Sequence, residues 1–252
     1  MCTLIISRRP SHRWPVLIGA NRDEMRDRAW EPPYSHWPDR KHVMAGRDLE
    51  AGGTWLALNR DGVVASILNG QNSLGFAPGK RSRGELPLEA VDHEDASTAA
   101  TAMAQLEPTS YRSFNMIIAD AREAFWLRSD GVEIESEPVP EGISMLTAFD
   151  LNDEIASDRV RYHLPRFRLA QIPNPDTNDW FAWEALLAST ERENQIKYAG
   201  AMNIQTDFGF ATVSSTLIAL PNLKLFGTSP VWRFCPGEPG AVPFSNIGLN
   251  WM

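Results

Sequence analysis

Apolar runs near the start of the chain predict a hairpin of two buried strands. Residues 2–7 and 14–20 are largely apolar, and a polar segment around His12 and Arg13 separates them. A polar segment of this kind between two apolar runs is typical of a turn. The tetrapeptide Asn-Arg-Asp-Glu at residues 21–24 follows the second run directly. The pattern therefore places four polar residues at the end of a buried strand.

The same reasoning predicts a second hairpin and several helices. Asp61-Gly62 lies between apolar runs at residues 55–58 and 63–68, which is a strong short-range hairpin signal. Asp95 and Asn178 are candidate N-caps for helices. The predicted helices are residues 85–106 in two pieces, 158–169 and 179–190.

The rest of the chain divides into further strands and irregular segments. Strands are predicted at residues 114–119, 124–128, 132–137, 210–220, 223–227 and 231–234. Segments rich in Pro, Gly or polar residues are predicted to be irregular or loops, namely residues 30–41, 45–54 and 71–84.

The order of these elements predicts an α+β fold. Strands come first, then helices, strands, helices and strands again, without the regular alternation of a doubly wound sheet. This order fits stacked, mainly antiparallel sheets covered by helices. No repeat or linker interrupts the pattern, so a single domain over residues 1–252 is expected.

Composition excludes several classes of protein. The chain carries 24 Lys and Arg against 32 Asp and Glu, a formal net charge of −8, which argues against a nucleic-acid binder. Its only cysteines, Cys2 and Cys235, are too few for a disulfide scaffold, a four-cysteine zinc site or an iron–sulfur cluster. The five histidines show no metal-ligand spacing, so neither a metal nor a cofactor is expected.

The chain shows no targeting or membrane signal. No window approaches the roughly 20 apolar residues of a membrane span. At the N-terminus the apolar run precedes the charges, the reverse of a secretory signal. A cytoplasmic location and free thiols are therefore expected.

The predicted N-terminal hairpin brings Cys2 beside the polar tetrapeptide. If the turn centres on His12 and Arg13, the numbers of facing residues sum to about 25. Cys2 then faces Asp23, and Leu4 faces Asn21. A slip of one residue would keep the partner of Cys2 within residues 21–24.

A thiol at the chain start beside a carboxylate fits N-terminal nucleophile catalysis. Once Met1 is removed, the α-amine of Cys2, with a pKa of about 8, can act as general base for its own thiol. Asp23 would orient the amine, and Asn69 at the end of a strand would offer an amide to the oxyanion. The alternative is that Cys2 is a small buried apolar residue and residues 21–24 form a solvated turn.

These residues resemble the NRDE family, also called the transport-and-Golgi-organisation protein 2 family. The resemblance rests on Met-Cys-Thr at the start, Asn-Arg-Asp-Glu at residues 21–24, and Ala-Gly-Arg-Asp-Leu-Glu-Ala-Gly-Gly-Thr-Trp-Leu at residues 45–56 with Asn69 downstream. Residues 82–86 and 114–116 also match. The family is similar to the N-terminal nucleophile hydrolases of the penicillin V acylase and bile-salt hydrolase branch. The resemblance implies a four-layer αββα sandwich, Cys2 as nucleophile and Asp23 as its partner.

Three positions depart from that branch. Its arginine three residues before the aspartate is replaced by Ala20, and the nearest arginine is Arg22. Residues 146–148 have no amide side chain where the acylases place an asparagine donor, and Val213 stands where relatives carry arginine. Loss of one oxyanion donor lowers a rate by ~10²–10³, so these departures imply a depleted oxyanion hole.

The sequence leaves more than one function open. The first is hydrolysis of a small, non-peptide amide through a Cys2 thioester, with Arg22, Asp23 and Asn69 as the other catalytic residues. Candidate substrate anchors in this hypothesis are Asn21, Arg47 and Arg83.

The second hypothesis is a non-catalytic protein of haem or lipid and acyl-CoA trafficking, as proposed for eukaryotic relatives. Cys235-Pro236 is of the kind seen in haem-responsive segments, although a strand-ending turn also explains it. A role in partner binding alone is the third hypothesis, and no sequence feature specifies that partner.

Overall fold

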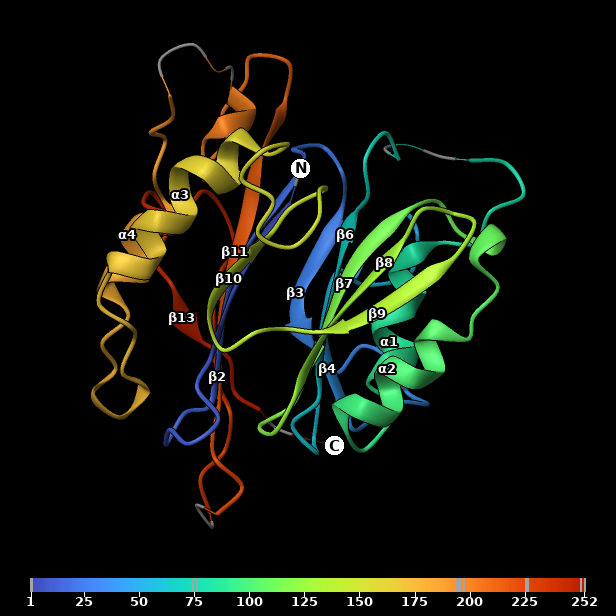
Figure 1. The fold of residues 1–252 in the computed structure, drawn as a ribbon, viewed down its shortest axis with the longest axis horizontal. Coiled ribbons are helices and arrows are strands. Elements are labelled where there is room, and N and C mark those ends of the chain that lie inside the picture. Colours follow the sequence, from blue (N-terminus) through green and yellow to red (C-terminus); the bar gives the residue numbers. More distant parts are fainter. Residues whose placement is uncertain are drawn as a thin grey trace. The chain divides into compact units, whose positions relative to one another are not determined.

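The computed structural model describes residues 2–73, 75, 77–193, 196, 198–224, 227–249 and 251. The chain divides into two compact units, Met1–Asp27 with Pro140–Gly248 and Arg28–Val139 with Leu249–Met252 (Figure 1). Each unit is built from two separate segments of the chain, so the division does not follow the sequence as two consecutive domains would.

The first unit contains a six-stranded sheet in the order β10-β1-β2-β11-β12-β13, with all neighbours antiparallel. Its strands are β1 (Thr3–Arg8), β2 (Val16–Met25), β10 (Gly142–Leu146), β11 (Phe210–Leu220), β12 (Val231–Cys235) and β13 (Ser245–Asn246). Strand β2 lies between the first strand of the chain and one near its end. The sheet therefore brings residues about 200 positions apart side by side.

Helices α3 (Asp158–Leu169) and α4 (Phe181–Leu187) pack on one face of this sheet, as Figure 1 shows. Ser157 caps α3 by accepting a hydrogen bond from the backbone N–H of Val160. The core between helices and sheet joins Phe167 and Trp183 to Ile5 and Leu217. Two short 3-10 turns, Pro175–Thr177 and Tyr198–Gly200, complete this part of the chain.

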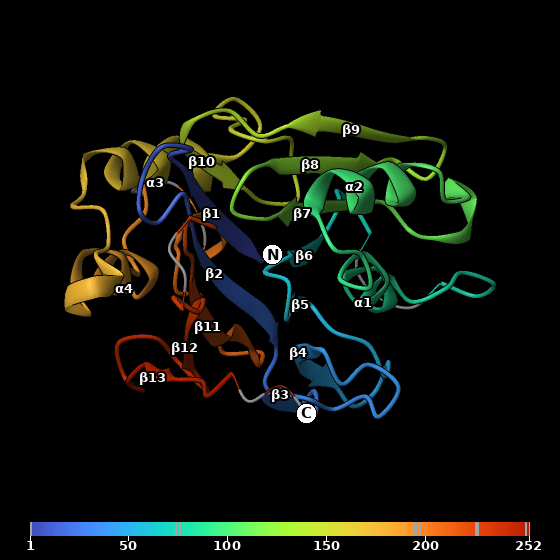
Figure 2. The ribbon, with the colours of Figure 1, turned by 90° about the horizontal axis from the view of Figure 1, so that it is seen from below.

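The second unit contains a seven-stranded antiparallel sheet whose strands follow sequence order. They are β3 (Trp30–Tyr34), β4 (Val43–Asp48), β5 (Leu56–Asn59), β6 (Val64–Asn69), β7 (Phe114–Ala119), β8 (Ala124–Ser129) and β9 (Ile134–Pro138). Helices α1 (Leu86–Ala90) and α2 (Ala96–Ala104) lie on one face of this sheet in both views (Figures 1 and 2). The 3-10 turns are Arg83–Glu85 and Pro108–Ser110.

The structure confirms the α+β class and most of the predicted elements. Helix α3 has the predicted bounds, and Asp95 caps α2 by accepting from the backbone N–H of Thr98. The hairpin of β5 and β6 turns at Gly62, which has a φ of 87° that suits glycine. Leu4, Ile5 and Ile6 of β1 are all 0% exposed, so both faces of this strand are buried. This explains why the sequence shows continuous apolar runs rather than alternation.

Two segments predicted as irregular are strands. Residues 30–34 form β3 despite two prolines, because β3 is an edge strand, where missing backbone donors are tolerated. Residues 45–48 belong to β4, although Gly46 is among the residues that predict a loop there. A Cβ at Gly46 would lie 2.4 Å from the ring of Trp55, so this glycine provides space rather than a turn.

Other predictions fail at element ends. Asn178 does not cap α4; it has a φ of 55° and ends a 3-10 turn, while the Asp179 side chain accepts from the N–H of Phe181. Leu223 and Lys224 lie in a turn, whereas Leu225 and Phe226 lie outside the described residues. The antiparallel partner of β11 is instead β12. Strands β10 and β13 were not predicted.

Candidate active site

The N-terminal hairpin places the thiol of Cys2 beside residues 21–24. Thr3 faces Asn21 and Leu4 faces Ala20, so facing numbers sum to 24 rather than 25, and the predicted pairing of Leu4 with Asn21 is wrong by one residue. The Sγ of Cys2 lies 3.7 Å from the backbone carbonyl oxygen of Asp23 and donates to it. The thiol therefore contacts the backbone of Asp23.

The polar tetrapeptide is part of a strand and not a solvated turn. Asn21, Arg22 and Asp23 are only 1%, 6% and 5% exposed. They stay in the sheet because β11 pairs with β2 along this stretch, with Thr212 facing Asp23. The register shifts between Thr212 and Ser214, which identifies Val213 as the extra residue of a β-bulge.

Two donors from distant parts of the chain fix the carboxylate of Asp23. The hydroxyl of Thr212 donates to Oδ1 over 2.6 Å, and Nη1 of Arg159 donates to Oδ2 over 3.1 Å. The side chains of Arg159 and Asp23 are 3% and 0% exposed, so this is a buried ion pair. Arg159 also donates to the hydroxyl of Thr3 and, from Nε, to the carbonyl oxygen of Ala199 over 3.0 Å. Together these bonds hold the carboxylate in one orientation.

Sequence reasoning did not find Arg159, although its helix carries a signal. Arg159, His163 and Phe167 are buried at helical spacing together with Val160 and Leu164. An arginine inside the apolar stripe of a helix requires a buried partner. The partner here, Asp23, lies 136 residues earlier in the chain.

The surroundings of Cys2 raise the pKa of its thiol. Burial disfavours the thiolate, the negative charge of Asp23 adds to this effect, and the positive charge of Arg22 opposes it. The thiol is therefore protonated at neutral pH. Chemistry at this sulfur needs a base that removes the proton during attack.

The side chain of Asn21, a candidate substrate anchor, binds other groups of the protein. Its amide nitrogen donates to the carbonyl oxygens of Leu187 and Met202 over 2.9 and 3.0 Å, and its amide oxygen accepts from the hydroxyl of Ser215. This side chain therefore ties the end of α4 and the segment around Met202 to the sheet.

Two other predicted site residues lie in the second unit. Asn69 ends β6 opposite Phe114. Arg47 lies in β4 opposite Glu31, with 4.0 Å between its Nη1 and Oε2 of Glu31, and its side chain is 43% exposed. Arg47 therefore forms an ion pair at the surface of the second unit.

Arg83 also binds within the second unit. Its Nη1 donates to the hydroxyl of Ser73 and to the carbonyl oxygen of Ser113 over 2.6 and 2.7 Å, and its Nη2 donates to the carbonyl oxygen of Ser73. These bonds connect two loops of this unit, which is a structural role.

Cys235 is an inaccessible thiol. It is 0% exposed, and its Sγ donates to the carbonyl oxygen of Val242 over 3.2 Å. The pair Cys235-Pro236 thus ends β12, in agreement with the strand-ending alternative. A haem iron could not reach this sulfur without a local opening of the fold.

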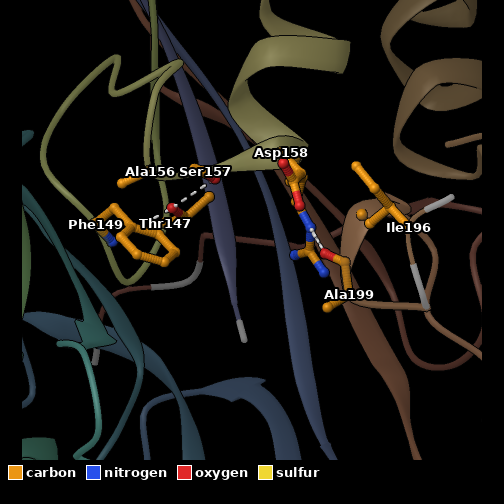
Figure 3. A pocket seen from close by; sticks show the side chains of 9 residues that line it. Thr147, Phe149, Ala156, Ser157, Asp158, Ile196 and Ala199 are labelled. Atoms are coloured by element: carbon orange, nitrogen blue, oxygen red, sulfur yellow. Dashed lines mark hydrogen bonds between the residues drawn. The ribbon is translucent and has the colours of Figure 1, made fainter. Parts of the chain in front are cut away.

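A cavity of about 140 Å³ lies at the N-terminal end of α3 (Figure 3). Figure 3 shows Phe149 and Thr147 on one side of it and Ile196 and Ala199 on the other. The remaining lining residues are Ala156, Ser157, Asp158, Arg159 and Gly200. Because Arg159 also binds Asp23, the cavity shares one side chain with the Cys2 site.

The described part of the chain contains no group of three or more His, Cys, Asp or Glu side chains that could hold a metal ion. None of the helices found among those residues is both long and apolar enough to span a membrane.

Comparison with known proteins gives one family match and several structural likenesses. The model of the family described as Transport and Golgi organisation 2 matches residues 1–228. A sequence comparison with curated proteins gives no match.

Three solved N-terminal nucleophile hydrolases resemble the structure. A variant of conjugated bile acid hydrolase from Clostridium perfringens has a TM-score of 0.55 and 11% identity, over 99% of this chain and 93% of that chain. The Caenorhabditis elegans ortholog of N-acylethanolamine-hydrolyzing acid amidase has a TM-score of 0.51 and 12% identity, over 91% and 98%. Penicillin V acylase from Agrobacterium tumefaciens has a TM-score of 0.48 and 10% identity, over 98% of both chains. The first two likenesses show the fold.

Proposed function

We propose, from the premise that this chain belongs to the Transport and Golgi organisation 2 family, that it is an N-terminal nucleophile cysteine hydrolase acting on small amides. The observation that carries the proposal is the position of the Cys2 thiol beside Asp23, whose carboxylate is held by Arg159 and Thr212. A carboxylate fixed this firmly next to the chain start can orient an α-amine.

The proposed reaction begins after removal of Met1. The α-amine of Cys2 takes the thiol proton while the sulfur attacks the amide carbonyl carbon, and the proton passes to the leaving nitrogen as the C–N bond breaks. The acyl group is then a thioester on Cys2. Water, deprotonated by the same amine, attacks the thioester carbon and releases the carboxylic acid and the thiol.

The electrostatics of the site support a base-assisted mechanism. A thiol whose pKa is raised by burial and by Asp23 does not ionise in advance, so it depends on a base in contact with it. The α-amine of the same residue meets this requirement without a histidine. The acylase branch carries an arginine three residues before the aspartate, and Ala20 stands at that position of β2 here. Arg159 provides a buried guanidinium near Asp23 from another element, helix α3.

Arg22 is proposed as a cation that favours the thiolate during attack, and the oxyanion role of Asn69 stays a prediction from the sequence. The charge of Arg22 acts on the thiol in the direction that this role requires. A reducing, cytoplasmic setting is part of the proposal, since both Cys2 and Cys235 are free thiols.

The test compares the processed wild type with Cys2→Ala and with Cys235→Ala as a matched control. Intact-protein mass spectrometry after incubation with a panel of N-acyl amides should show loss of Met1 and an acyl adduct on the wild type and on Cys235→Ala, but none on Cys2→Ala. Retention of Met1 in protein purified from its cells, or an adduct on Cys2→Ala, would overturn the proposal.

A further inference from the structure

The cavity at the N-terminal end of α3 lies on the helix-covered face of the six-stranded sheet. Arg159, which lines the cavity, donates to the hydroxyl of Thr3, and Ile5 packs in the core beneath the helices. Because side chains alternate along a strand, Leu4 and Cys2 turn toward the opposite face. Neither of them lines the cavity. A molecule bound in the cavity would therefore lie on the other side of β1 from the thiol.

The cavity is closed by buried groups at its base and reached from solvent at its rim. Thr147, Ser157 and Arg159 are buried lining residues. Ala156, by contrast, is exposed, and Phe149 is only partly buried. A ligand can thus enter from the rim without unfolding of the protein.

The charged groups in the cavity wall are paired within the protein. The guanidinium of Arg159 is bound by Asp23 and by the carbonyl oxygen of Ala199. The carboxylate of Asp158 accepts a hydrogen bond from Arg161. An anion would meet the carboxylate of Asp158, and a cation would meet the guanidinium of Arg159. Either ion would lose hydration and compete with the existing partners, so the wall favours an uncharged ligand.

The rest of the lining is apolar or has hydroxyls that bind within the protein. Phe149 and Ile196 face the cavity from opposite sides (Figure 3). The hydroxyl of Ser157 accepts from the hydroxyl of Thr147 over 3.4 Å and from the backbone N–H of Val160 over 3.3 Å. Such a lining gains free energy from contact with hydrocarbon.

The volume of the cavity sets the size of the group that fits. At about 140 Å³ it is close to the ~150 Å³ engineered protein cavity that binds benzene. A single six-membered ring therefore fits, and a small substituent on the ring can reach the rim. A fused ring system or a long acyl chain is larger than this space.

Arg159 connects the cavity to the ends of β1 and β2. The guanidinium that forms part of the wall also donates to the hydroxyl of Thr3 and to the carboxylate of Asp23. A ligand stabilises the conformation to which it binds more tightly. A ring packed against Arg159 needs the wall in place, so it favours the rotamer of Arg159 that makes these bonds.

We propose that this cavity is an effector site for a small uncharged molecule with one six-membered hydrocarbon ring, and that its occupation holds Arg159 on Thr3 and Asp23. The effector is distinct from any substrate of Cys2, since the two lie on opposite faces of the sheet. The inference therefore goes beyond the proposed function and does not require turnover.

The first test compares three ligands of nearly equal size, namely benzyl alcohol, benzylamine and benzoate. Calorimetric titration into the wild type at neutral pH should show binding of benzyl alcohol, and the two charged compounds should bind at least about tenfold more weakly. No binding of benzyl alcohol, or equally tight binding of either ion, would overturn the inference.

Two substitutions locate the bound ring. Ala199→Leu and Ala156→Leu fill the cavity from different lining positions, and each should weaken the binding of benzyl alcohol about tenfold or more. Ile155→Ala is the matched control, because Ile155 is 94% exposed and does not line the cavity. If both filled variants bind benzyl alcohol as tightly as the control, the ligand binds elsewhere and the assignment is wrong.

Hydrogen exchange followed by mass spectrometry tests the connection through Arg159. Saturating benzyl alcohol should slow amide exchange of the wild type in residues 2–8 and 19–25, which contain Thr3 and Asp23. Coupling between sites is reciprocal, so Asp23→Asn, which leaves the cavity lining intact, should weaken binding of benzyl alcohol about fivefold or more. Unchanged exchange in both segments at saturation, or equal affinity in Asp23→Asn, would refute the coupling.

These measurements keep the inference separate from the hydrolase. None of them uses turnover, and the exchange experiment needs only the wild type. Binding and slowed exchange without any acyl adduct on Cys2 would support the effector site and overturn the hydrolase. An acyl adduct on Cys2 without binding of benzyl alcohol would retain the hydrolase and overturn the effector site.

Discussion

Arg159 donates a hydrogen bond over 3.1 Å to the carboxylate of Asp23, and both side chains are almost completely excluded from solvent. This pair joins helix α3 to the end of β2. It also connects the support of the Cys2 site to the cavity that Arg159 lines.

Removing Arg159 should destabilise the protein strongly. Arg159→Met leaves the buried carboxylate of Asp23 without its cation, and breaking a buried ion pair typically lowers the free energy of unfolding by about 3–5 kcal/mol. Urea denaturation followed by circular dichroism measures this loss.

Arg159→Lys is the control for charge, since it keeps the cation but not the contacts to Thr3 and Ala199. It should recover part of the stability. If the midpoint of urea unfolding of Arg159→Met equals that of the wild type, the ion pair does not stabilise the fold.

The hydroxyl of Thr212 should support both Asp23, to which it donates, and the backbone N–H of Ile204, from which it accepts over 2.9 Å. Thr212→Val keeps the shape of the side chain but leaves one buried carboxylate oxygen without its donor, which costs about 1–3 kcal/mol. Thr101→Val is the control, because its hydroxyl is an exposed helix-surface group and should change stability by less than about 0.5 kcal/mol. Thermal melts of the two variants should differ clearly, and equal melting temperatures would refute the role of this hydrogen bond.

The ionisation of Cys2 should respond to Asp23. The negative charge of Asp23 raises the pKa of the thiol, so Asp23→Asn should move the midpoint of Cys2 alkylation to lower pH. The rate of iodoacetamide modification against pH, followed by mass spectrometry, gives this midpoint. Both proteins carry Cys235→Ala, which removes the second thiol. An upward shift in Asp23→Asn would show that the carboxylate does not act on the sulfur by charge.

His163 should make stability depend on pH. It is 0% exposed, and burial together with the charge of Arg159 lowers its pKa from 6.5 to about 4. In the unfolded chain it binds a proton below about pH 6.5, while in the folded protein it stays neutral until about pH 4. Stability is therefore full above pH 6.5 and falls by about 3 kcal/mol as the pH drops through this window.

The control for this pH effect is His163→Gln, which cannot titrate. It should reduce the loss of unfolding free energy between pH 7 and pH 4 by about 3 kcal/mol. If the free energy of unfolding of His163→Gln changes with pH as steeply as that of the wild type, other groups cause the effect.

Gly46 should tolerate no side chain while Trp55 is present. A Cβ at this position would lie 2.4 Å from the Trp55 ring, and overpacking of this kind costs about 1–3 kcal/mol. Gly46→Ala should lower the melting temperature, and Trp55→Leu combined with Gly46→Ala should cost less than the sum of the two single changes. Additive effects would show that the two positions do not contact each other.

Several parts of the Gly-rich motif at residues 45–56 thus have a structural explanation. Asp48 accepts from Arg28 over 2.7 and 3.1 Å and from the backbone N–H groups of Glu50 and Ala51. These contacts shape the turn after β4. A motif typical of a family does not by itself mark residues that contact a substrate.

The sequence by itself determined the local elements and the neighbourhood of Cys2. Apolar runs and turn residues act over short distances, so the hairpins and the bounds of α3 followed from them, and the first hairpin alone brought Cys2 to residues 21–24 within one residue of register. The same local signals failed at Gly46 and at the prolines of β3, where the ring of Trp55, just before β5, or a place at the sheet edge decides the structure.

Only the tertiary structure decided what holds Asp23. Thr212 and Arg159 lie 189 and 136 residues away in the chain, and their contacts depend on the order β1-β2-β11 and on the packing of α3 against that sheet. Neither the order of strands nor the partner of a buried arginine is encoded in a local pattern, because both result from the way all the apolar faces are buried together.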